Sequence, residues 1–338
     1  FRDLRLLGES VSADGYAQAK DVLKIVVGLA GLFEGIGIVL LLFAFVPQFG
    51  LEGIWVSVFT AISAFCNAGF DLLGTGASLT TEAGEPLLNL VIMALIVAGG
   101  LGFLVWDDVL ANRFHFRRYR LHSKLVLTGT AALLVVGTVL FYIVEGDHAF
   151  AGVPTGQRLL MAAFQSVTCR TAGFNTADLM ALSQAGILIS MALMFIGAGS
   201  GSTGGGIKVN PFAVLLLGIR ARALRKDDVN VFHRRLEEDT IHQAFSSVSI
   251  FALTCLLGCL VLCLEGVRVD DALFEAVSAI GTVGLTHGVT PTLKAASKVA
   301  ITLLMFAGRV GSLSVAMAMT RDRPHPKVRN VPEKILIG

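Results

Sequence analysis

The sequence predicts an all-α integral membrane protein built from repeated units, each made of a span, a short half-helix with a glycine loop, and a second span. Three observations predict this class. Of the 338 residues, 54% are hydrophobic and 15% are charged, whereas soluble domains carry about 25% charged residues. Several apolar runs approach or exceed the roughly 20 residues that cross a bilayer as a helix. The loops between these runs repeat one pattern three times.

Six apolar runs are expected to span the membrane. They are 22–46, 87–105, 125–144, 187–196 continued by 209–219, 245–264 and 295–319. The second spans of the first and third units, 87–105 and 295–319, are expected to run nearly unbroken, whereas the second span of the middle unit is interrupted.

Lysine and arginine residues are concentrated in four segments: 2–24, 113–124, 220–235 and 321–334. Arg158, Arg170 and Arg268 belong to the more acidic segments of the opposite side. Because cytoplasmic loops carry an excess of Lys and Arg, we expect a multi-pass protein of the cytoplasmic membrane with both ends of the given chain in the cytoplasm. The distributed charge, net +2, argues against nucleic-acid binding.

The repeated pattern opens with Phe, has Ser or Thr four residues later, and then reaches a Gly between a small and an apolar residue. The copies are FTAISAFCNAGFDLLG from Phe59, FQSVTCRTAGFNTADL from Phe164 and FEAVSAIGTVGLTHGV from Phe274. The hydroxyl residues are Ser63, Thr168 and Ser278. The repeat divides the chain into three equivalent units.

The dozen residues before each glycine are too few to cross the bilayer, so these loops are expected to be re-entrant. A half-helix that stops midway directs the negative end of its dipole at the membrane interior, where it favours a cation. Glycine at positive φ lets successive carbonyl oxygens face one axis and replace a hydration shell. The predicted ion ligands are Asn67, Ala68, Gly69 and Phe70, then Thr171, Ala172, Gly173 and Phe174, and finally Thr282, Val283, Gly284 and Leu285.

Together with the stretches GAGSGSTGGGIK, MFAGRVG and EKILIG, these loops resemble the potassium-translocating subunits of the Trk/Ktr/HKT superfamily, most closely the KtrB type. The resemblance implies K⁺ uptake, possible involvement of Na⁺, and four units around one central pore whose loops form a selectivity filter. Three units are visible, so the first is expected upstream of Phe1. Cys169 departs from the proline expected in its loop. The resemblance also implies a homodimer on a cytosolic ring of nucleotide-binding regulatory subunits of the KtrA type.

Residues 197–206 contain six glycines in ten positions, each costing ~1 kcal/mol relative to Ala within a helix. Irregular backbone at membrane depth must line a cavity or be buried in protein. We therefore interpret the stretch as a mobile gate below the filter, and the resemblance implies the same role. The gate residues are Gly197, Ala198, Gly199, Ser200, Gly201, Ser202, Thr203, Gly204, Gly205 and Gly206, with Lys208 and Arg309 beside them.

Arg309 and Glu34 lie deep within predicted spans, and Lys208 lies just beyond the glycine stretch. Arg309 is expected midway along the last span, either as an electrostatic barrier below the filter or in a structural pair with a carbonyl or with a carboxylate such as Glu34. Lys208 either points its ammonium group toward the cytoplasmic exit or pairs locally. Glu34 is either a partner charge or a helix-packing residue.

A rival interpretation of the glycine stretch is nucleotide binding, because Gly199 to Gly204 satisfies G-x-G-x-x-G. That fingerprint requires a preceding β-strand and a βαβ unit, and the flanks here are apolar helices. A second rival is a Na⁺-permeable relative of the same superfamily. No catalytic set, metal-ligand spacing or organic cofactor motif is visible, so the sequence does not predict an enzyme. Cys255, Cys259 and Cys263 are expected to pack within a helix.

The expected organisation follows from these assignments. It comprises 1–20 as the cytoplasmic end of the missing unit, 21–112 as the second pore unit, 113–121 as a linker, 122–225 as the third pore unit with the gating loop, 226–239 as a linker, 240–320 as the fourth pore unit, and 321–338 as a cytoplasmic tail.

Overall fold

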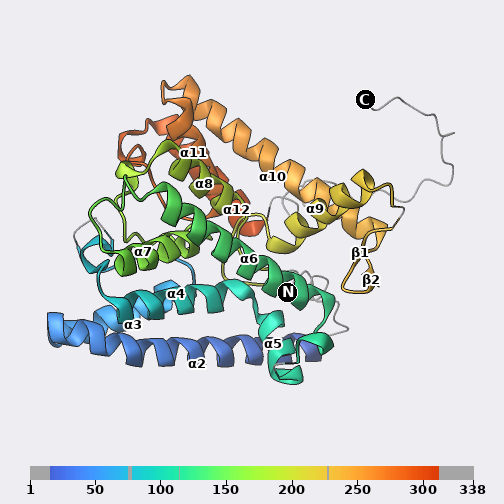
Figure 1. The fold of residues 1–338 in the computed structure, drawn as a ribbon, viewed down its shortest axis with the longest axis horizontal. Helices are drawn as coiled ribbons and strands as arrows, with labels where there is room; N and C mark the ends of the chain where they lie inside the picture. The colour runs from blue at the N-terminus through green and yellow to red at the C-terminus, as the bar shows by residue number, and fades with distance from the viewer. Residues whose placement is uncertain (1–15, 75–77, 114, 227, 312–338) are drawn as a thin grey trace.

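The computed structural model describes residues 16–74, 78–113, 115–226 and 228–311. These residues fold mainly into helices, in an arrangement that repeats along the chain (Figure 1). The expectations for residues 1–15 and for the C-terminal tail lie outside the described residues.

The three units share one order of elements: a long helix, a half-helix, a 3₁₀ turn and a second helix. The first unit contains α2 (Tyr16–Phe49), α3 (Glu52–Phe65), η1 (Thr80–Glu82) and α4 (Pro86–Leu101). The second contains α6 (Leu121–Val144), α7 (Thr155–Thr168), η3 (Leu179–Ala181) and α8 (Gln184–Phe195). The third contains α10 (Glu238–Leu264), α11 (Val269–Gly281), η4 (Thr290–Thr292) and α12 (Ala295–Val310).

Shorter elements connect the units. They are α5 (Phe103–Asn112), η2 (Phe116–Arg118), α9 (Val209–Ala223) and the antiparallel strands β1 (Asn230–Val231) and β2 (Arg234–Arg235), which pair Asn230 with Arg235. The helix α9 packs against α6 and α10, so the chain after the glycine stretch lies along the long helices of two units.

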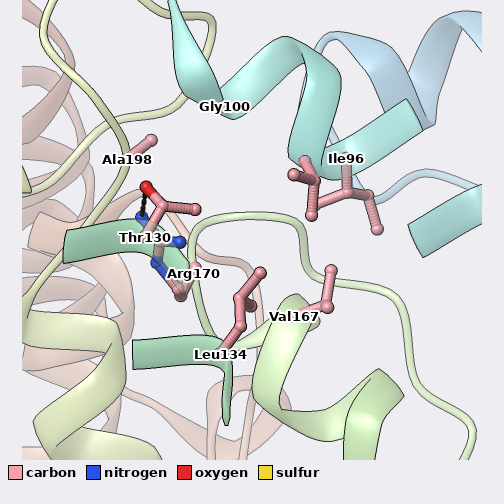
Figure 2. Close-up of a pocket in the computed structure, with 8 residues that line it drawn as sticks. Ile96, Gly100, Thr130, Leu134, Val167, Arg170 and Ala198 are labelled. Atoms are coloured by element: carbon pink, nitrogen blue, oxygen red, sulfur yellow. Dashed lines mark hydrogen bonds between the residues drawn. The ribbon is translucent and has the colours of Figure 1, made fainter. Parts of the chain in front are cut away.

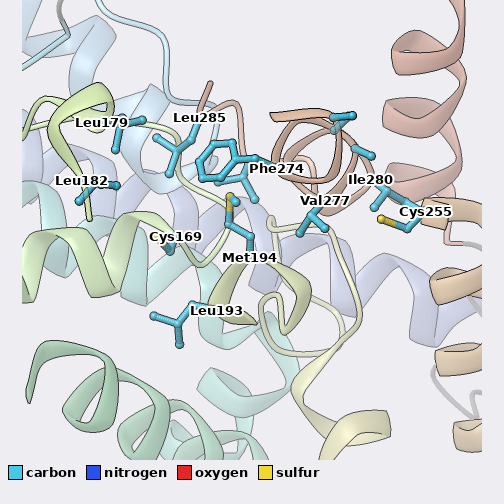
Figure 3. Packing of buried hydrophobic residues seen from close by; sticks show 14 of the residues in the cluster. Cys169, Leu179, Leu182, Leu193, Met194, Cys255, Phe274, Val277, Ile280 and Leu285 are labelled. Carbon is cyan, nitrogen blue, oxygen red and sulfur yellow. The ribbon is translucent and has the colours of Figure 1, made fainter. Parts of the chain in front are cut away.

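One packing rule joins the units. Within each unit the long helix packs on its own half-helix, and the second helix of one unit then packs on the half-helix of the next, α4 on α7 and α8 on α11. Figure 3 shows the second of these contacts, where Met194 of α8 lies beside Phe274 of α11 and near Cys169 and Leu285. The half-helices α7 and α11 are therefore held by their own unit and by the preceding one.

Local sequence explains how the second helices begin. Ser183 precedes α8, and its hydroxyl accepts a hydrogen bond from the Gly186 amide, which satisfies one of the free donors of a helix N-terminus. Buried Glu145, at the end of α6, accepts from the Ser183 amide and hydroxyl at 3.2 and 2.6 Å. Glu265, at the end of α10, accepts from the Ser297 amide and hydroxyl at the start of α12. In the second and third units, a carboxylate at the end of the long helix thus binds the start of the second helix.

Three described helices, α2, α6 and α10, are long and apolar enough to cross a membrane, and a fourth span results if α4 and α5 are counted together. The prediction that 87–105 runs nearly unbroken is wrong: α4 ends at Leu101 and the chain bends by 93° into α5. Gly102 lies at the bend with φ +97°, a conformation that L side chains rarely adopt.

The last predicted span, 295–319, begins as expected, but its helix ends at Val310, and Gly311 has φ +94°. Residues 312–319 lie outside the described part of the chain. The cysteine prediction is confirmed for Cys255 and Cys259, which are buried in the main hydrophobic cluster.

Candidate functional site

The three glycine loops meet at one place in the structure. A Cβ added at Gly69 would collide with the Ala172 carbonyl oxygen, and one added at Gly173 would collide with the Val283 carbonyl oxygen. A Cβ on Gly284 would lie 3.9 Å from the Gly173 Cα. The three glycines have φ values of +72°, +88° and +90°. The left-handed conformation therefore favours glycine at all three positions, and the close approach of backbone from the neighbouring unit requires it at Gly69 and Gly173.

The residue two positions before each glycine also has a left-handed backbone. The φ values are 51° for Asn67, 78° for Thr171 and 52° for Thr282. A β-branched residue in this region is an outlier that costs of order 1–3 kcal/mol and persists only where its surroundings hold it. The Asn67 side-chain amide and Thr171 Oγ1 lie 3.2 Å apart, so the side chains of two units also touch here.

Each loop is held by a hydroxyl from its own half-helix. Ser63 Oγ donates to the Phe70 carbonyl at 2.8 Å, Thr168 Oγ1 to the Phe174 carbonyl at 2.6 Å, and Ser278 Oγ to the Leu285 carbonyl at 2.6 Å. These hydroxyl residues belong to the sequence repeat, which by itself predicted no role for them. Their role is to fix the carbonyl of the residue that follows each glycine.

The cluster offers neutral oxygen ligands. The backbone carbonyls of residues 67–70, 171–174 and 282–285 and the side chains of Asn67, Thr171 and Thr282 are available, and none of the three stretches contains a carboxylate. Oxygen ligands of this kind suit hard cations. Among the described residues, no group of three His, Cys, Asp or Glu side chains is arranged to hold a metal ion.

The glycine-rich stretch is irregular, as predicted, and its two ends are joined. α8 ends at Phe195 and α9 begins at Val209. Ile196 and Ile207 form an isolated bridge, and the Gly197 amide donates to the Ile207 carbonyl at 2.8 Å. Residues 197–206 therefore form a closed loop with a base at 197 and 206.

The tip of this loop comprises residues 200–205, and its last two residues lie against the predicted filter residues. A Cβ added at Gly204 would collide with Thr171 Oγ1, and one added at Gly205 would collide with Thr282 Oγ1. Thr203 Oγ1 donates at 2.9 Å to the carbonyl of Phe65, the last residue of α3. The consecutive glycines thus let the tip pack directly beside Thr171 and Thr282, two of the three side chains predicted to line the filter.

The loop also pairs with the bend between α4 and α5. The Gly199 amide donates to the Gly100 carbonyl at 2.8 Å, the Thr203 amide to the Gly99 carbonyl at 3.3 Å, and the Phe103 amide to the Gly201 carbonyl at 3.1 Å. A continuous helix would have paired these carbonyls and this amide internally. Because the helix breaks at Gly102, they bind the loop instead.

Three cationic side chains bind carbonyls of the loop. Lys208 Nζ donates to the Gly204 carbonyl and Arg309 Nη1 to the Thr203 carbonyl. Arg170 Nη2 donates to the Gly197 carbonyl at 3.1 Å. Lys208 was expected either to point toward the cytoplasmic exit or to pair locally, and in the structure it pairs locally. The loop is held at its base and at its tip.

Two expectations for charged residues need correction. Arg309 lies in the last turn of α12 and not midway along a helix, and of the structural partners considered it contacts a carbonyl, while Glu34 Oε1 accepts from Cys66 Sγ at 3.9 Å. Arg170, assigned to the opposite-side segments, is only 6% exposed and lies at the base of the loop. The spacing of Arg170 in the sequence did not mark it as a residue that contacts the loop. Its position between a half-helix and a predicted filter stretch was the one feature that could have indicated this.

The dinucleotide fingerprint lacks its structural context. Ile196, just before the glycines, makes a single bridge, and the strands of the described chain are two residues each and follow α9. A βαβ unit is absent from the described residues, so Gly199 to Gly204 do not form the phosphate-binding turn of that fold.

Comparisons with known proteins agree on one family. The family model of TrkH, a cation transport protein, matches residues 6–330. The chain is 37% identical to the potassium/sodium uptake protein NtpJ of Enterococcus hirae, over 98% of this chain and 75% of that protein. It is 36% identical to the Ktr system potassium uptake protein B of Vibrio alginolyticus, over 100% of this chain and 74% of that protein.

A solved structure has the same fold. The crystal structure of the potassium transporter TrkH from Vibrio parahaemolyticus superposes with a TM-score of 0.71 at 19% identity. The superposition covers 90% of this chain and 64% of that one. At this identity the likeness establishes the fold alone.

Proposed function

Because the chain belongs to the TrkH family of cation transport proteins, we propose that it takes up K⁺ across the cytoplasmic membrane through a filter formed by its three glycine loops. The family consists of multi-pass membrane transporters, so the chain is a transport protein and not an enzyme. K⁺ is the transported substrate, and no organic cofactor takes part in the proposal.

The observation that supports the filter most strongly is the meeting of Gly69, Gly173 and Gly284 at one place with left-handed backbones. Three half-helices end there, and helix C-terminal ends favour a cation. K⁺ loses its hydration shell more readily than smaller cations, and carbonyl oxygens replace that shell. The fixed carbonyls after each glycine provide such oxygens without a carboxylate that would hold the ion too tightly.

The loop 197–206 serves as the gate in this proposal. Its tip lies against Thr171 and Thr282, so an ion leaving the filter meets the loop. Because the loop is held by hydrogen bonds from several elements, opening requires a second arrangement that a partner stabilises by binding it more tightly. The helix α9 follows the loop directly and is the element on which such a partner acts.

Arg309 serves as an electrostatic barrier beside the gate. It shares the tip of the loop with Lys208, and the two cations bind consecutive carbonyls, those of Thr203 and Gly204. A positive charge near the exit of a cation path raises the energy of an ion resting there. The hydrogen bond to the Thr203 carbonyl holds the Arg309 charge in this position, so Arg309 both stabilises the loop and acts as the barrier.

A Na⁺-permeable transporter is the second candidate. One relative is named for potassium and sodium uptake, and neutral oxygens coordinate both ions. This second candidate also includes a transporter whose K⁺ flux depends on Na⁺. Competition between the two ions for one uptake pathway distinguishes the candidates.

The assembly proposed around this chain has three parts. A fourth unit completes the pore between α12 and α3, as the packing of α4 on α7 and α8 on α11 suggests. The complete subunit forms a homodimer, and a cytosolic nucleotide-binding ring of the KtrA type regulates it. Support for the regulatory part comes from the name of one relative, a component of a Ktr system. Both ends of the given chain face the cytoplasm in this arrangement.

Uptake of radioactive Rb⁺ by vesicles containing the full-length protein tests the filter. We expect K⁺ to compete with Rb⁺ at least about tenfold better than Na⁺, a difference of ~1.4 kcal/mol. Thr168→Val removes the hydroxyl that fixes the Phe174 carbonyl and should lower this preference about fivefold, since one hydrogen bond contributes ~1 kcal/mol. The control is Thr138→Val, whose hydroxyl donates to the Leu134 carbonyl within α6. Equal competition by Na⁺ in the unmodified protein would support the second candidate.

Deletion of residues 200–205 tests the gate. Without the tip, the path below the filter is open, so Rb⁺ flux should rise and should no longer respond to the regulatory partner. The preference for K⁺ over Na⁺ should be retained, because the deletion leaves the hydroxyl-to-carbonyl bonds of the filter intact. A folded deletion variant with unchanged flux and unchanged regulation would show that the loop is not a gate.

Arg309→Gln tests the barrier, with Arg309→Lys as the control that keeps the charge. Removal of the positive charge lowers the barrier for a passing cation, so Rb⁺ flux per folded molecule should increase in Arg309→Gln and stay near the original value in Arg309→Lys. Flux is normalised to monodisperse protein measured by size-exclusion chromatography. Equal flux in the two folded variants contradicts the barrier.

A further inference from the structure

Arg170 is a buried cation that the proposed transport path does not use as a ligand. It stands between Cys169, which caps α7, and Thr171 of the filter. Only 6% of the residue is exposed. Figure 2 shows its guanidinium group pointing toward Thr130 and Ala198, beside a small cavity that Gly100 and Leu134 also line.

The partners of the guanidinium group are all neutral. Nη2 donates to Thr130 Oγ1 at 3.3 Å and to the Gly197 carbonyl at 3.1 Å. Nε is buried and lacks a hydrogen-bond partner, and within the described part of the chain no carboxylate forms an ion pair with Arg170. A buried charge without a counter-charge is costly, and such residues inside membrane proteins commonly have a functional role.

The carbonyl that Arg170 binds belongs to the base of the loop. Gly197 follows the end of α8, where carbonyls have no partner within the helix, and a basic side chain at a helix C-terminus stabilises both the carbonyls and the helix dipole. The Gly197 amide donates to Ile207 at the other end of the loop. Arg170 therefore binds the point at which the loop leaves and rejoins the helices.

The next residue, Thr171, lies against Gly204 at the tip of the same loop. Two consecutive residues of the second filter stretch thus contact the base and the tip. The equivalent positions of the other two units, three residues before the glycine, are Cys66 and Gly281, which carry no cationic side chain. The arginine occurs in the unit that contains the loop.

We propose that Arg170 is a positioning residue that anchors the base of the gating loop to the second filter stretch, so that the tip moves while the base stays in place. This inference rests on the proposed gate. With the anchor removed, the base shifts, the tip no longer stays below the filter, and the adjoining filter stretch loses a fixed neighbour. Flux without the regulatory partner then rises, and the preference for K⁺ over Na⁺ falls.

A double-mutant cycle in the full-length protein tests the anchor. Rb⁺ flux per folded molecule is measured for the unmodified protein, Arg170→Met, the 200–205 deletion, and the two changes combined. Arg170→Met should raise flux about threefold or more when the loop is intact and change it little when the tip is deleted, because residues that act through a shared element are not additive. Arg170→Lys, which keeps a cationic donor, should restore most of the closure and of the ion preference.

The matched control is Arg158→Met on α7, the half-helix that precedes Arg170. Arg158 also binds a carbonyl, that of Tyr142, at 2.6 Å, but at the opposite end of α7. Its replacement should lower the yield of folded protein without an effect that depends on the loop. Should Arg170→Met fail to fold, Arg170→Gln takes its place in the cycle.

The outcomes separate the anchor from the gate. If Arg170→Met changes flux by the same factor with and without the tip, or leaves both flux and ion preference unchanged, the anchor is wrong and the gate stands. If the deletion alone leaves flux and regulation unchanged, the gate is wrong and the anchor falls with it.

Discussion

The close approach of three glycine backbones is the constraint on which the rest of this structure depends. Gly69 packs against the Ala172 carbonyl and Gly173 against the Val283 carbonyl, so the second and third loops occupy the space that side chains at these two glycines would fill. Left-handed backbone at the glycines and two residues before them turns each stretch back on itself. Polar backbone of this kind is tolerated inside a membrane protein only where partners or a cavity satisfy it.

The surrounding helices maintain that approach. Each half-helix is held by its own long helix and, for α7 and α11, by the second helix of the preceding unit. A hydroxyl on each half-helix then binds the carbonyl just after the glycine. The loop 197–206 fits against the cluster because Gly204 and Gly205 carry no side chain, and three cationic side chains bind its carbonyls. In a medium of low dielectric such hydrogen bonds are stronger than in water, so the closed arrangement is well defined.

Much of the architecture was predictable from the sequence. The three Phe-to-Gly patterns predicted the half-helices, the glycine loops and the order of the units, because each copy carries both an apolar period and a helix-breaking end. The glycine stretch predicted an interruption for the same reason. The bend at Gly102 was not predicted, since Gly99 to Gly102 continue an apolar run and glycine at the end of a run is compatible with either a continuing or a broken helix.

Side-chain partners were less accessible to sequence reasoning. Arg170 was assigned to the opposite-side segments, because the direction of its side chain depends on how α7 packs against α6 and α4. The contact of Arg309 with the Thr203 carbonyl joins positions 106 residues apart, and no local pattern encodes such a pair. The hydroxyls of Ser63, Thr168 and Ser278 were visible as a repeat, but their carbonyl partners follow only from the turn that the left-handed residues produce.

The position of the bound cation tests the central claim most directly. Anomalous scattering from Rb⁺ in crystals of the full-length protein would locate the ion without assumptions about flux. We predict a peak among the backbone oxygens of residues 67–70, 171–174 and 282–285, next to the tip of the loop 197–206. A well-ordered Rb⁺ peak elsewhere along the path, with none among these oxygens, would contradict it.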